Sequence, residues 1–433
     1  MRGRRRVAYS MGNNLLSVWS TIGSVALAIF ILLAMITIHE FGHWLAGKIL
    51  HFKINEFSIG FGPALFKRKG KKTGEIFALR LIPLGGYCAF DGEDGLEEEE
   101  PAPVFEEEQP NDGERVLLTP AEESAPAEKK EAEQTPGQRR KENGKFTEMK
   151  PWKRIIVLVA GAFMNYLLAL FLILICFSAY GQTMLAVYEV EPTDDIPAAY
   201  CLQDKDIFLQ AEGKNLYLTT DLARALNGKK AGDRVSLYIS RIVSQEKDEE
   251  GKVVKTEREK MNVEIILRSD VSVKNSAQLD SAWAALGVKH SEEQGYMLAS
   301  GTQKFGFFET IGRSFMYSFK IAGSIFKVIG ELLTGNLGIS ALGGPITTIT
   351  MTSQVASQSF RSFLEIASFI GVNLAVFNLL PIPALDGSKV VFTVIEWVRG
   401  KPISRKVEAI IHAVGFVLLL GFAVLVDILQ FVI

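Results

Sequence analysis

The sequence has few cysteines and almost no net charge. Its three cysteines, Cys88, Cys176 and Cys201, are far apart and form no CxxC pair, so the sequence indicates neither a disulfide framework nor a thiolate metal site. A formal net charge of −2 over 433 residues gives no reason to expect nucleic acid as a partner.

Long apolar runs are the first feature that is present. Hydrophobic residues make up 48% of the chain and charged residues 22%, a mixture typical of a membrane protein with water-exposed parts. A spanning helix needs about 20 apolar residues, and four runs meet this length, at about 18–38, 155–180, 363–385 and 410–426. The first run is too long for a signal peptide and lacks a small-residue cleavage site. Four spans place both termini on the same side of the membrane.

Lysine and arginine indicate how the four spans are oriented. Both are frequent between the first and second runs and again between the third and fourth, so these two loops are expected in the cytoplasm. Residues 182–358 are then expected outside. One signal conflicts, because the arginines at 2 and 4–6 would also lie outside; a start at Met11 would remove the conflict.

Two segments between the spans differ in character. From about residue 93 to 134 the chain is rich in Glu, Pro and Ala, and such a segment repels itself and cannot form a core. It is predicted to be a disordered cytoplasmic spacer, with a docking tail for a basic partner as the alternative. Residues 185–268 alternate as strands do, around the helix-like stretch TTDLARALNG, and predict a small α/β or β-rich domain.

The segment 305–333 has an amphipathic pattern. Its charges fall on one narrow stripe of a helix, and the remaining positions are mostly apolar; the charged residues are Glu309, Arg313, Lys320, Lys327 and Glu331. The pattern predicts a helix that lies in the membrane interface. An ordinary amphipathic helix packed on a soluble domain is the alternative.

The motif HEFGH, from His39 to His43, ends the first apolar run. Helical positions i and i+4 share one face, so both imidazoles can bind one ion, and imidazole nitrogen suits zinc. Glu40 lies beside this ion and can take a proton from a water molecule. Ionisable groups within a membrane span are costly and usually functional. The motif therefore predicts a metal site inside the membrane.

Zinc usually takes three protein ligands, so one more is needed. His51, His290 and His412 are poorer candidates, because they lie beyond the helix end, in the outer region and at the start of the last span. Asp386 is the predicted third ligand, with a turn residue as the alternative.

Asp386 follows the stretch NLLPIPAL, whose prolines prevent a regular helix. Unwound backbone at membrane depth must line a cavity, and there a carboxylate can reach an ion. Asn378, in the same stretch, is predicted to donate a hydrogen bond to a developing oxyanion, with a helix–helix hydrogen bond as the alternative. Asn165 and Asn373 are assigned that packing role.

Together these residues resemble the site-2 protease family of intramembrane zinc metalloproteases, and more narrowly its bacterial regulator of sigma-E protease type. HEFGH resembles the family's HExxH, and residues 378–387 resemble its NxxPxPxLDG. FSIGFGPALF, LRLIPLGGYCAFDGE, KPWKRIIVLVAGAFMN and LGGPI are similar to further family segments. Departures are Ala162 in place of a proline, Ser388 in place of a second glycine, TDDIPAA in place of a glycine-containing turn, and the acidic insert.

The fold expected is a mainly α-helical polytopic membrane protein with four transmembrane helices, a small cytoplasmic-side β segment and one extracytoplasmic PDZ-like domain, the last implied by the resemblance. The expected parts are 1–50, the first transmembrane helix with HEFGH; 51–92, a membrane-associated β segment; 93–145, the acidic disordered insert; 150–181, the second transmembrane helix; 184–268, the PDZ-like domain; 300–358, the interfacial helix region; 360–387, the third transmembrane helix with the LDG motif; and 388–433, a cytoplasmic loop and the fourth transmembrane helix.

The function expected is that of a zinc-dependent endopeptidase in a bacterial plasma membrane, with its site near the cytoplasmic side. His39, His43 and Asp386 would hold the Zn²⁺, with Glu40 as the base and Asn378 at the oxyanion. An edge of the β segment could bind an extended substrate. The partners expected are the lipid bilayer and single-span membrane proteins already trimmed outside; the resemblance implies anti-sigma factors or signal-peptide remnants.

Two other functions remain open at this stage. One is a catalytically silent metal-binding scaffold, against which Glu40 argues, because structural zinc needs no base. The other is a metal transporter, against which the second and fourth runs argue, because they are nearly free of ionisable residues.

Overall fold

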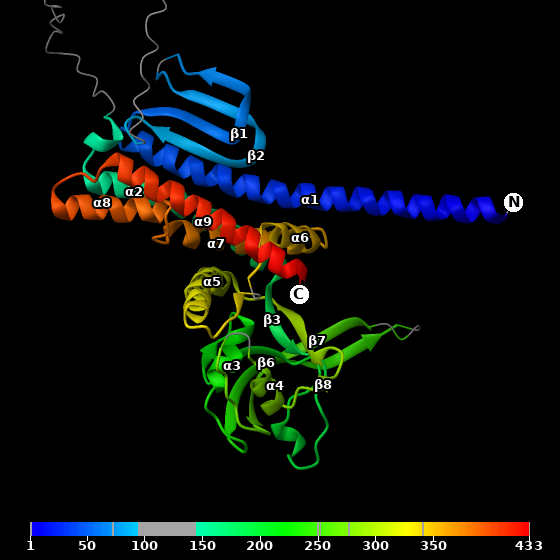
Figure 1. Ribbon diagram of the computed structural model, residues 1–433. Coiled ribbons are helices and arrows are strands. Elements are labelled where there is room, and N and C mark those ends of the chain that lie inside the picture. The colour runs from blue at the N-terminus through cyan, green and yellow to red at the C-terminus, as the bar shows by residue number, and fades with distance from the viewer. Residues whose placement is uncertain are drawn as a thin grey trace, which may run out of the picture.

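The computed structural model describes residues 2–71, 73–93, 144–248, 251, 253–275, 278–339 and 342–432. A bundle of long helices forms one part of the molecule and a six-stranded sheet domain the other (Figure 1). A small two-stranded sheet lies beside the C-terminal half of the first helix. The predicted insert at 93–145 falls almost wholly outside the described residues.

Four helices in the described part of the chain are long and apolar enough to cross a membrane. They are α1 (Arg2–Ile49), α2 (Pro151–Tyr180), α7 (Phe360–Leu379) and α9 (Arg405–Val432). The four membrane helices predicted from the sequence are thereby confirmed as candidate spans by length and composition. Helix α7 ends before the apolar run does, because Pro381 and Pro383 follow and cannot continue it.

The described residues form further helices, some in the bundle and some in the sheet domain. They are α3 (Thr219–Leu226), α4 (Asp280–Ala285), α5 (Phe307–Leu333), α6 (Pro345–Ala356) and α8 (Asp386–Arg399), with short 3-10 turns at Phe146–Glu148 and Ala198–Tyr200. Helix α8 begins directly after the proline-containing loop, so the chain turns there within a few residues.

Helix α2 is the centre of the bundle and packs against α1, α5, α7 and α8. Small residues lie where α1 and α7 come closest to α2. A Cβ atom on Gly42 of α1 would lie 2.4 Å from the carbonyl oxygen of Ala160, and one on Gly371 of α7 would lie 2.9 Å from the Cβ of Ala169. Without these side chains the helix backbones come close together, as is common in membrane bundles.

The two-stranded sheet consists of β1 (Ile54–Lys69) and β2 (Ile76–Phe90). The start of β1 pairs with both ends of β2, one on each side. Phe57, for example, lies opposite both Phe77 and Cys88. Residues 86–90 pair only with the start of β1 among the described strands, which makes them an edge of this sheet. Arg80 Nη2 donates to Glu56 Oε1 at 2.6 Å and ties the middle of β2 to β1.

A stem closes the chain on either side of residues 94–143. Phe52 forms a β-bridge with Gly144, and the backbone N–H of Phe146 donates to the carbonyl oxygen of Asp91 at 2.7 Å. The rings of Phe52, Phe90 and Phe146 pack together beneath these bonds, with Phe52 5.5 Å from Phe146 and 5.7 Å from Phe90 between ring centroids. The two sides of the stem are therefore held in contact by the described residues alone.

The six-stranded sheet has the order β10-β3-β4-β6-β7, with β5 beside β4. The strands are β3 (Gln182–Val187), β4 (Ile207–Ala211), β5 (Lys214–Asn215), β6 (Arg234–Lys247), β7 (Val253–Ile266) and β10 (Leu298–Gln303); β8 (His290–Ser291) and β9 (Gly295–Tyr296) form a separate hairpin. Trp283 and Val288 lie in the same core as Phe208. The domain thus extends past Arg268, the boundary expected from the sequence, because β10 completes the sheet.

Helix α5 joins the sheet domain to the bundle. Its Arg313 is buried, donating from Nε to Gln182 Oε1 at 2.6 Å and from Nη2 to the carbonyl oxygen of Leu216 at 2.8 Å. Its other side is apolar and exposed; Phe308, for example, is 85% exposed. Of the charged stripe, Arg313 and Lys320 therefore bind the sheet domain. Ile321 and Ile325 pack against the bundle, and the exposed apolar side chains remain available to a membrane interface.

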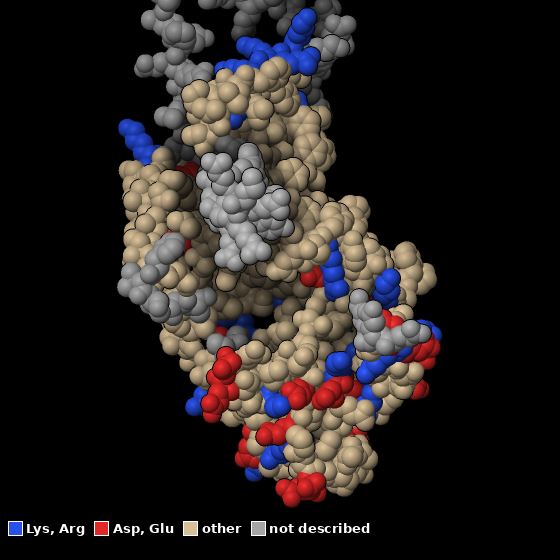
Figure 2. Space-filling model, turned by 90° about the vertical axis from the view of Figure 1, so that its right-hand side faces the viewer, with Lys and Arg blue, Asp and Glu red and all other residues tan. Residues whose placement is uncertain are grey.

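Charged side chains are unevenly distributed over the surface. In Figure 2, both signs gather on the sheet domain, and lysine and arginine gather at the opposite end of the view. Between them lies a zone in which the described residues carry few charges. Such a zone is what a bilayer-facing surface requires, because exposed charge is costly in hydrocarbon.

A buried ion pair links α2 to α8. Arg154 Nη1 donates to Glu396 Oε2 at 2.7 Å, and both side chains are buried. We predict that Arg154→Leu or Glu396→Leu alone lowers the free energy of unfolding by about 3–5 kcal/mol, because each leaves an unpaired buried charge. The double variant should lose clearly less than either single variant. Denaturant titration of the purified proteins measures this; equal or additive losses would contradict it.

Candidate metal centre

His39 and His43 lie one turn apart on α1 and face the same side. Their Nε2 atoms are 3.1 Å apart, and the residues are only 8% and 7% exposed. The helix alone produces this pair, because positions i and i+4 lie one above the other. The spacing read from the sequence thus brings two imidazole nitrogens to one point inside the helical bundle.

Asp386 completes a cluster of three donors with these imidazoles. Its Oδ2 atom lies 2.9 Å from His39 Nε2 and 3.3 Å from His43 Nε2, although 347 residues separate Asp386 from His39 in sequence. Ligands about 2.0–2.1 Å from a tetrahedral zinc ion are about 3.4 Å apart, so one ion fits these three atoms after small shifts. Two imidazoles and a carboxylate are also a donor set that zinc accepts.

Asp386 Oδ2 lies within hydrogen-bonding distance of both imidazoles, and a cation bound at this point would favour the charged form of the carboxylate. Burial meanwhile raises the pKa of the Cys88 thiol far above neutrality, which leaves that residue unsuited to act as a thiolate ligand.

Each imidazole has a second partner that orients it. His43 Nδ1 lies 2.8 Å from the carbonyl oxygen of Val157 on α2, so Nδ1 carries the proton and Nε2 is free to bind a metal. His39 Nδ1 lies 3.2 Å from the side-chain amide of Asn378. With its amide oxygen turned towards Nδ1, Asn378 would accept from His39 in the same way. The oxyanion role of Asn378 stays a prediction.

Gly161 is a feature of the site that sequence reasoning missed. A Cβ atom on this residue of α2 would lie 2.3 Å from His43 Nε2 and 2.8 Å from His39 Cε1. A glycine is therefore needed for α2 to pass beside the imidazoles. Its only signal in the sequence was its place in the stretch AGAFMN, where Ala162, one of the departures from the family pattern, is itself buried against the bundle.

Glu40 is a residue of α1, and its side chain lies against the small sheet. A Cβ atom on Gly86 of β2 would lie 3.1 Å from Glu40 Cγ and 2.9 Å from the carbonyl oxygen of Ser58. Gly86, the first of the edge residues 86–90, therefore lies directly beside the predicted base. Glycine at this position leaves the space that Glu40 occupies.

The other histidines and asparagines singled out from the sequence lie elsewhere. His51 follows the end of α1, His290 lies in β8, and His412 lies on α9. Asn373 Nδ2 donates to the carbonyl oxygen of Phe369 in its own helix. The buried amide oxygen of Asn165 has no hydrogen-bond partner among the described residues, so the interhelical bonds assigned to these two asparagines are not observed.

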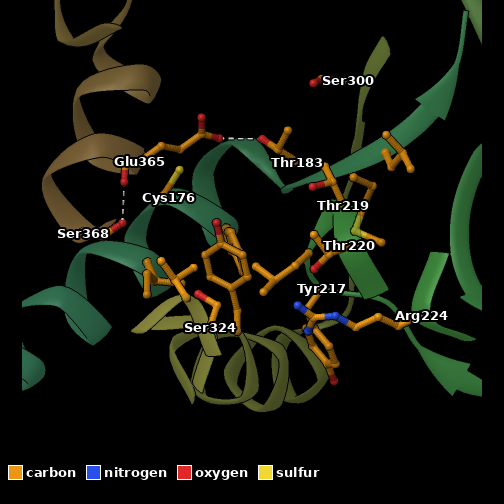
Figure 3. Close-up of a pocket in the computed structure, with 17 residues that line it drawn as sticks. Cys176, Thr183, Tyr217, Thr219, Thr220, Arg224, Ser300, Ser324, Glu365 and Ser368 are labelled. Carbon is orange, nitrogen blue, oxygen red and sulfur yellow. Dashed lines mark hydrogen bonds between the residues drawn. The ribbon is translucent and has the colours of Figure 1, made fainter. Parts of the chain in front are cut away.

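A cavity of the described structure lies away from the three donors. It measures about 450 Å³ and is enclosed by α2, α3, α5, α7 and β3 (Figure 3). Glu365 of α7 lines it and accepts a hydrogen bond from Thr183 at 2.6 Å, and several hydroxyl groups and apolar side chains form the rest of the wall. It contains none of the site residues predicted from the sequence.

Comparison with known proteins finds zinc metalloproteases among the similar chains. A 31% identical candidate zinc metalloprotease of Clostridium perfringens aligns over 91% of this chain and 94% of its own length. The zinc metalloprotease RasP of Bacillus licheniformis is 28% identical over 92% of this chain and 96% of its own length. A candidate zinc metalloprotease of Brucella suis is 27% identical over 93% of both chains.

The sequence profile of peptidase family M50 matches residues 27–422 and so includes both the helix of His39 and the loop of Asp386. This confirms the resemblance to site-2 proteases. The chain belongs to peptidase family M50.

Proposed function

We propose that this peptidase is a zinc-dependent endopeptidase that cleaves the transmembrane segments of single-span membrane proteins already trimmed outside the membrane. The observation that carries the proposal is the convergence of His39, His43 and Asp386 within 3.3 Å of one another in a bundle of apolar helices. The names of the relatives support zinc as the ion. Anti-sigma factors and signal-peptide remnants are the substrate classes that the family resemblance suggests.

The proposed chemistry divides between the ion and the chain. Bound zinc supplies Lewis acidity, which makes water a nucleophile at neutral pH. Glu40 takes a proton from the attacking water and delivers it to the leaving amine. Asn378 stabilises negative charge on the peptide oxygen, or orients His39, whose Nδ1 lies 3.2 Å from its amide. The carbonyl oxygen of Val157 orients the ring of His43.

We infer that the edge of β2 binds the substrate in extended form. A helical substrate hides its peptide bonds, so its backbone must unwind before water can attack. Residues 86–90 pair only with β1 among the described strands, and Gly86 lies against Glu40. A substrate strand added there would have its backbone fixed by hydrogen bonds beside the base.

The orientation proposed places the metal centre near the cytoplasm and the sheet domain, as a PDZ-like domain, outside. Helix α2 passes the imidazoles at Gly161 and reaches the sheet domain at Gly181, about 30 Å further along at 1.5 Å per residue. The basic loops next to the metal end support a cytoplasmic position in a bacterial plasma membrane. The apolar face of α5 would then lie in the outer interface.

Glu40→Gln should keep zinc but lose nearly all cleavage, because it removes the base and no ligand. The measurement is zinc content together with cleavage of a single-span substrate in detergent or liposomes. His39→Ala serves as the comparison and should lose metal as well. Cleavage by Glu40→Gln near the wild-type rate would overturn the proposed mechanism.

Asp386→Asn should weaken zinc binding by about tenfold or more, because a neutral amide is a poorer ligand than a carboxylate. Competition with a chromophoric chelator measures the affinity. Asp427→Asn is a suitable control, because this buried carboxylate of α9 binds the N terminus of α6 and not the imidazoles. If Asp386→Asn binds zinc as tightly as the wild type, Asp386 is a turn residue only.

Removal of residues 184–303, joined by a short flexible linker, should allow cleavage of full-length substrates that the wild type spares. A folded outer part of a substrate would have to displace the sheet domain, whereas a trimmed remnant would not. The deletion includes β10, because β10 pairs with β3 along its whole length. Short substrates should be cut at rates within roughly tenfold of the wild type, since the metal centre is unchanged. A folded, zinc-loaded variant that still rejects long substrates would show that selection lies elsewhere.

A further inference from the structure

The loop between α7 and α8 determines where the Asp386 carboxylate lies, and it has few internal bonds. Pro381 and Pro383 have no backbone N–H to donate. Ile382 and Leu385 donate to the carbonyl oxygens of Leu380 and Ile382, within the loop itself. The remaining loop residue, Ala384, has the positive φ of +75°, which non-glycine residues rarely adopt.

His412 of α9 provides the partner for this residue. The backbone N–H of Ala384 donates to His412 Nδ1 at 3.1 Å. Since Nδ1 accepts here, the ring carries its proton on Nε2. Among the loop residues 381–385, Ala384 is thus the one whose N–H is bonded to a side chain from another helix. An unbonded N–H in a water-poor bundle would cost free energy, so this contact stabilises the strained conformation.

Two further contacts fix the geometry of this bond. The His412 ring packs edge-on against Phe392 of α8, with 5.7 Å between ring centroids. A Cβ atom on Gly415 would lie 2.2 Å from the Cβ of Pro383, so the glycine one turn after His412 lets α9 approach the loop. Helix α9 therefore contacts the loop at Pro383 and Ala384 and contacts α8 at Phe392.

We propose that His412 is a positioning residue of the metal centre, holding the Ala384 N–H so that the Asp386 carboxylate meets the two imidazoles. Asp386 follows Ala384 by two residues, with little freedom between them, because Gly387 already lies against the carbonyl oxygens of Leu379 and Leu380. Groups that orient metal ligands typically contribute 10–100-fold to metal affinity or activity. His412 acts through the backbone of the loop, so we expect the lower end of that range.

The test compares three substitutions of similar size. His412→Leu removes the acceptor. His412→Asn places its amide oxygen as many bonds from Cβ as Nδ1 and keeps the acceptor, whereas His412→Gln places its oxygen one bond further out. Val414→Leu is the matched control, because Val414 lies on the same helix and is 54% exposed. Zinc affinity is measured by chelator competition in a Glu40→Gln background, so that the readout does not depend on proteolysis.

His412→Leu and His412→Gln should bind zinc about tenfold more weakly, and His412→Asn and Val414→Leu should bind it nearly as tightly as the parent protein. With Glu40 restored, kcat for a short substrate should fall in the same order while KM changes little, since the substrate-binding strand is untouched. If His412→Leu does not fold, the Asn and Gln variants still provide the comparison.

The inference fails if His412→Leu, or in its place His412→Gln, retains the zinc affinity of the parent. It also fails if the Asn, Gln and Leu variants are equally impaired, or if only the thermal midpoint of the metal-free protein changes, because ring packing alone then explains the residue. The inference rests on the proposed metal centre but not on proteolysis. A wild-type protein that binds zinc and cuts no substrate would overturn the proposed function and leave the role of His412 intact.

Discussion

The metal centre depends on the close contact between α1 and α2. Gly42 and Gly161 lie where the two helices meet, and a side chain at either would collide with backbone or with the imidazoles. Because the backbones approach so closely, the carbonyl oxygen of Val157 can accept from His43 and set its tautomer. Helix α7 then packs on α2 at Ala169, and its far end delivers Asp386 to the same place.

Both ends of α7 are anchored, and by different chemistry. At its start Arg361 donates to Thr302 of β10 at 2.7 Å, and Glu365 accepts from Thr183 of β3, so this end is bonded to the sheet domain. At its other end the loop before Asp386 is held by α9 and by the start of α8. A single helix thus connects the sheet domain with a metal ligand, and movement of that domain relative to the bundle would strain the bonds of Arg361 and Glu365.

The features that the sequence could predict are those encoded locally. HEFGH needs only helical spacing, and Asp386 was marked by the two prolines that break α7. Gly161 and the Val157 carbonyl could not be found in this way, because their role exists only where two helices touch. His412 carried a signal, an imidazole in an apolar run, but its partner is a backbone N–H that no side-chain pattern reveals. From the sequence, the sheet domain was expected to end at Arg268. Its last strand, β10, was not predicted as part of the domain, because a helix and a hairpin lie between Arg268 and β10.

The stem formed by Phe52, Asp91, Gly144 and Phe146 has a consequence for how this chain can vary. Its hydrogen bonds and aromatic contacts hold the two sides together. The free-energy cost of closing a chain segment between two such fixed ends rises only slowly, by about 0.6 kcal/mol for each doubling of its length. As long as the stem forms, the number of residues between its two sides should therefore have little effect on the stability of the helical bundle. This position can tolerate changes of length that the α7–α8 loop cannot, and it is a natural place to graft a fluorescent reporter or an affinity handle.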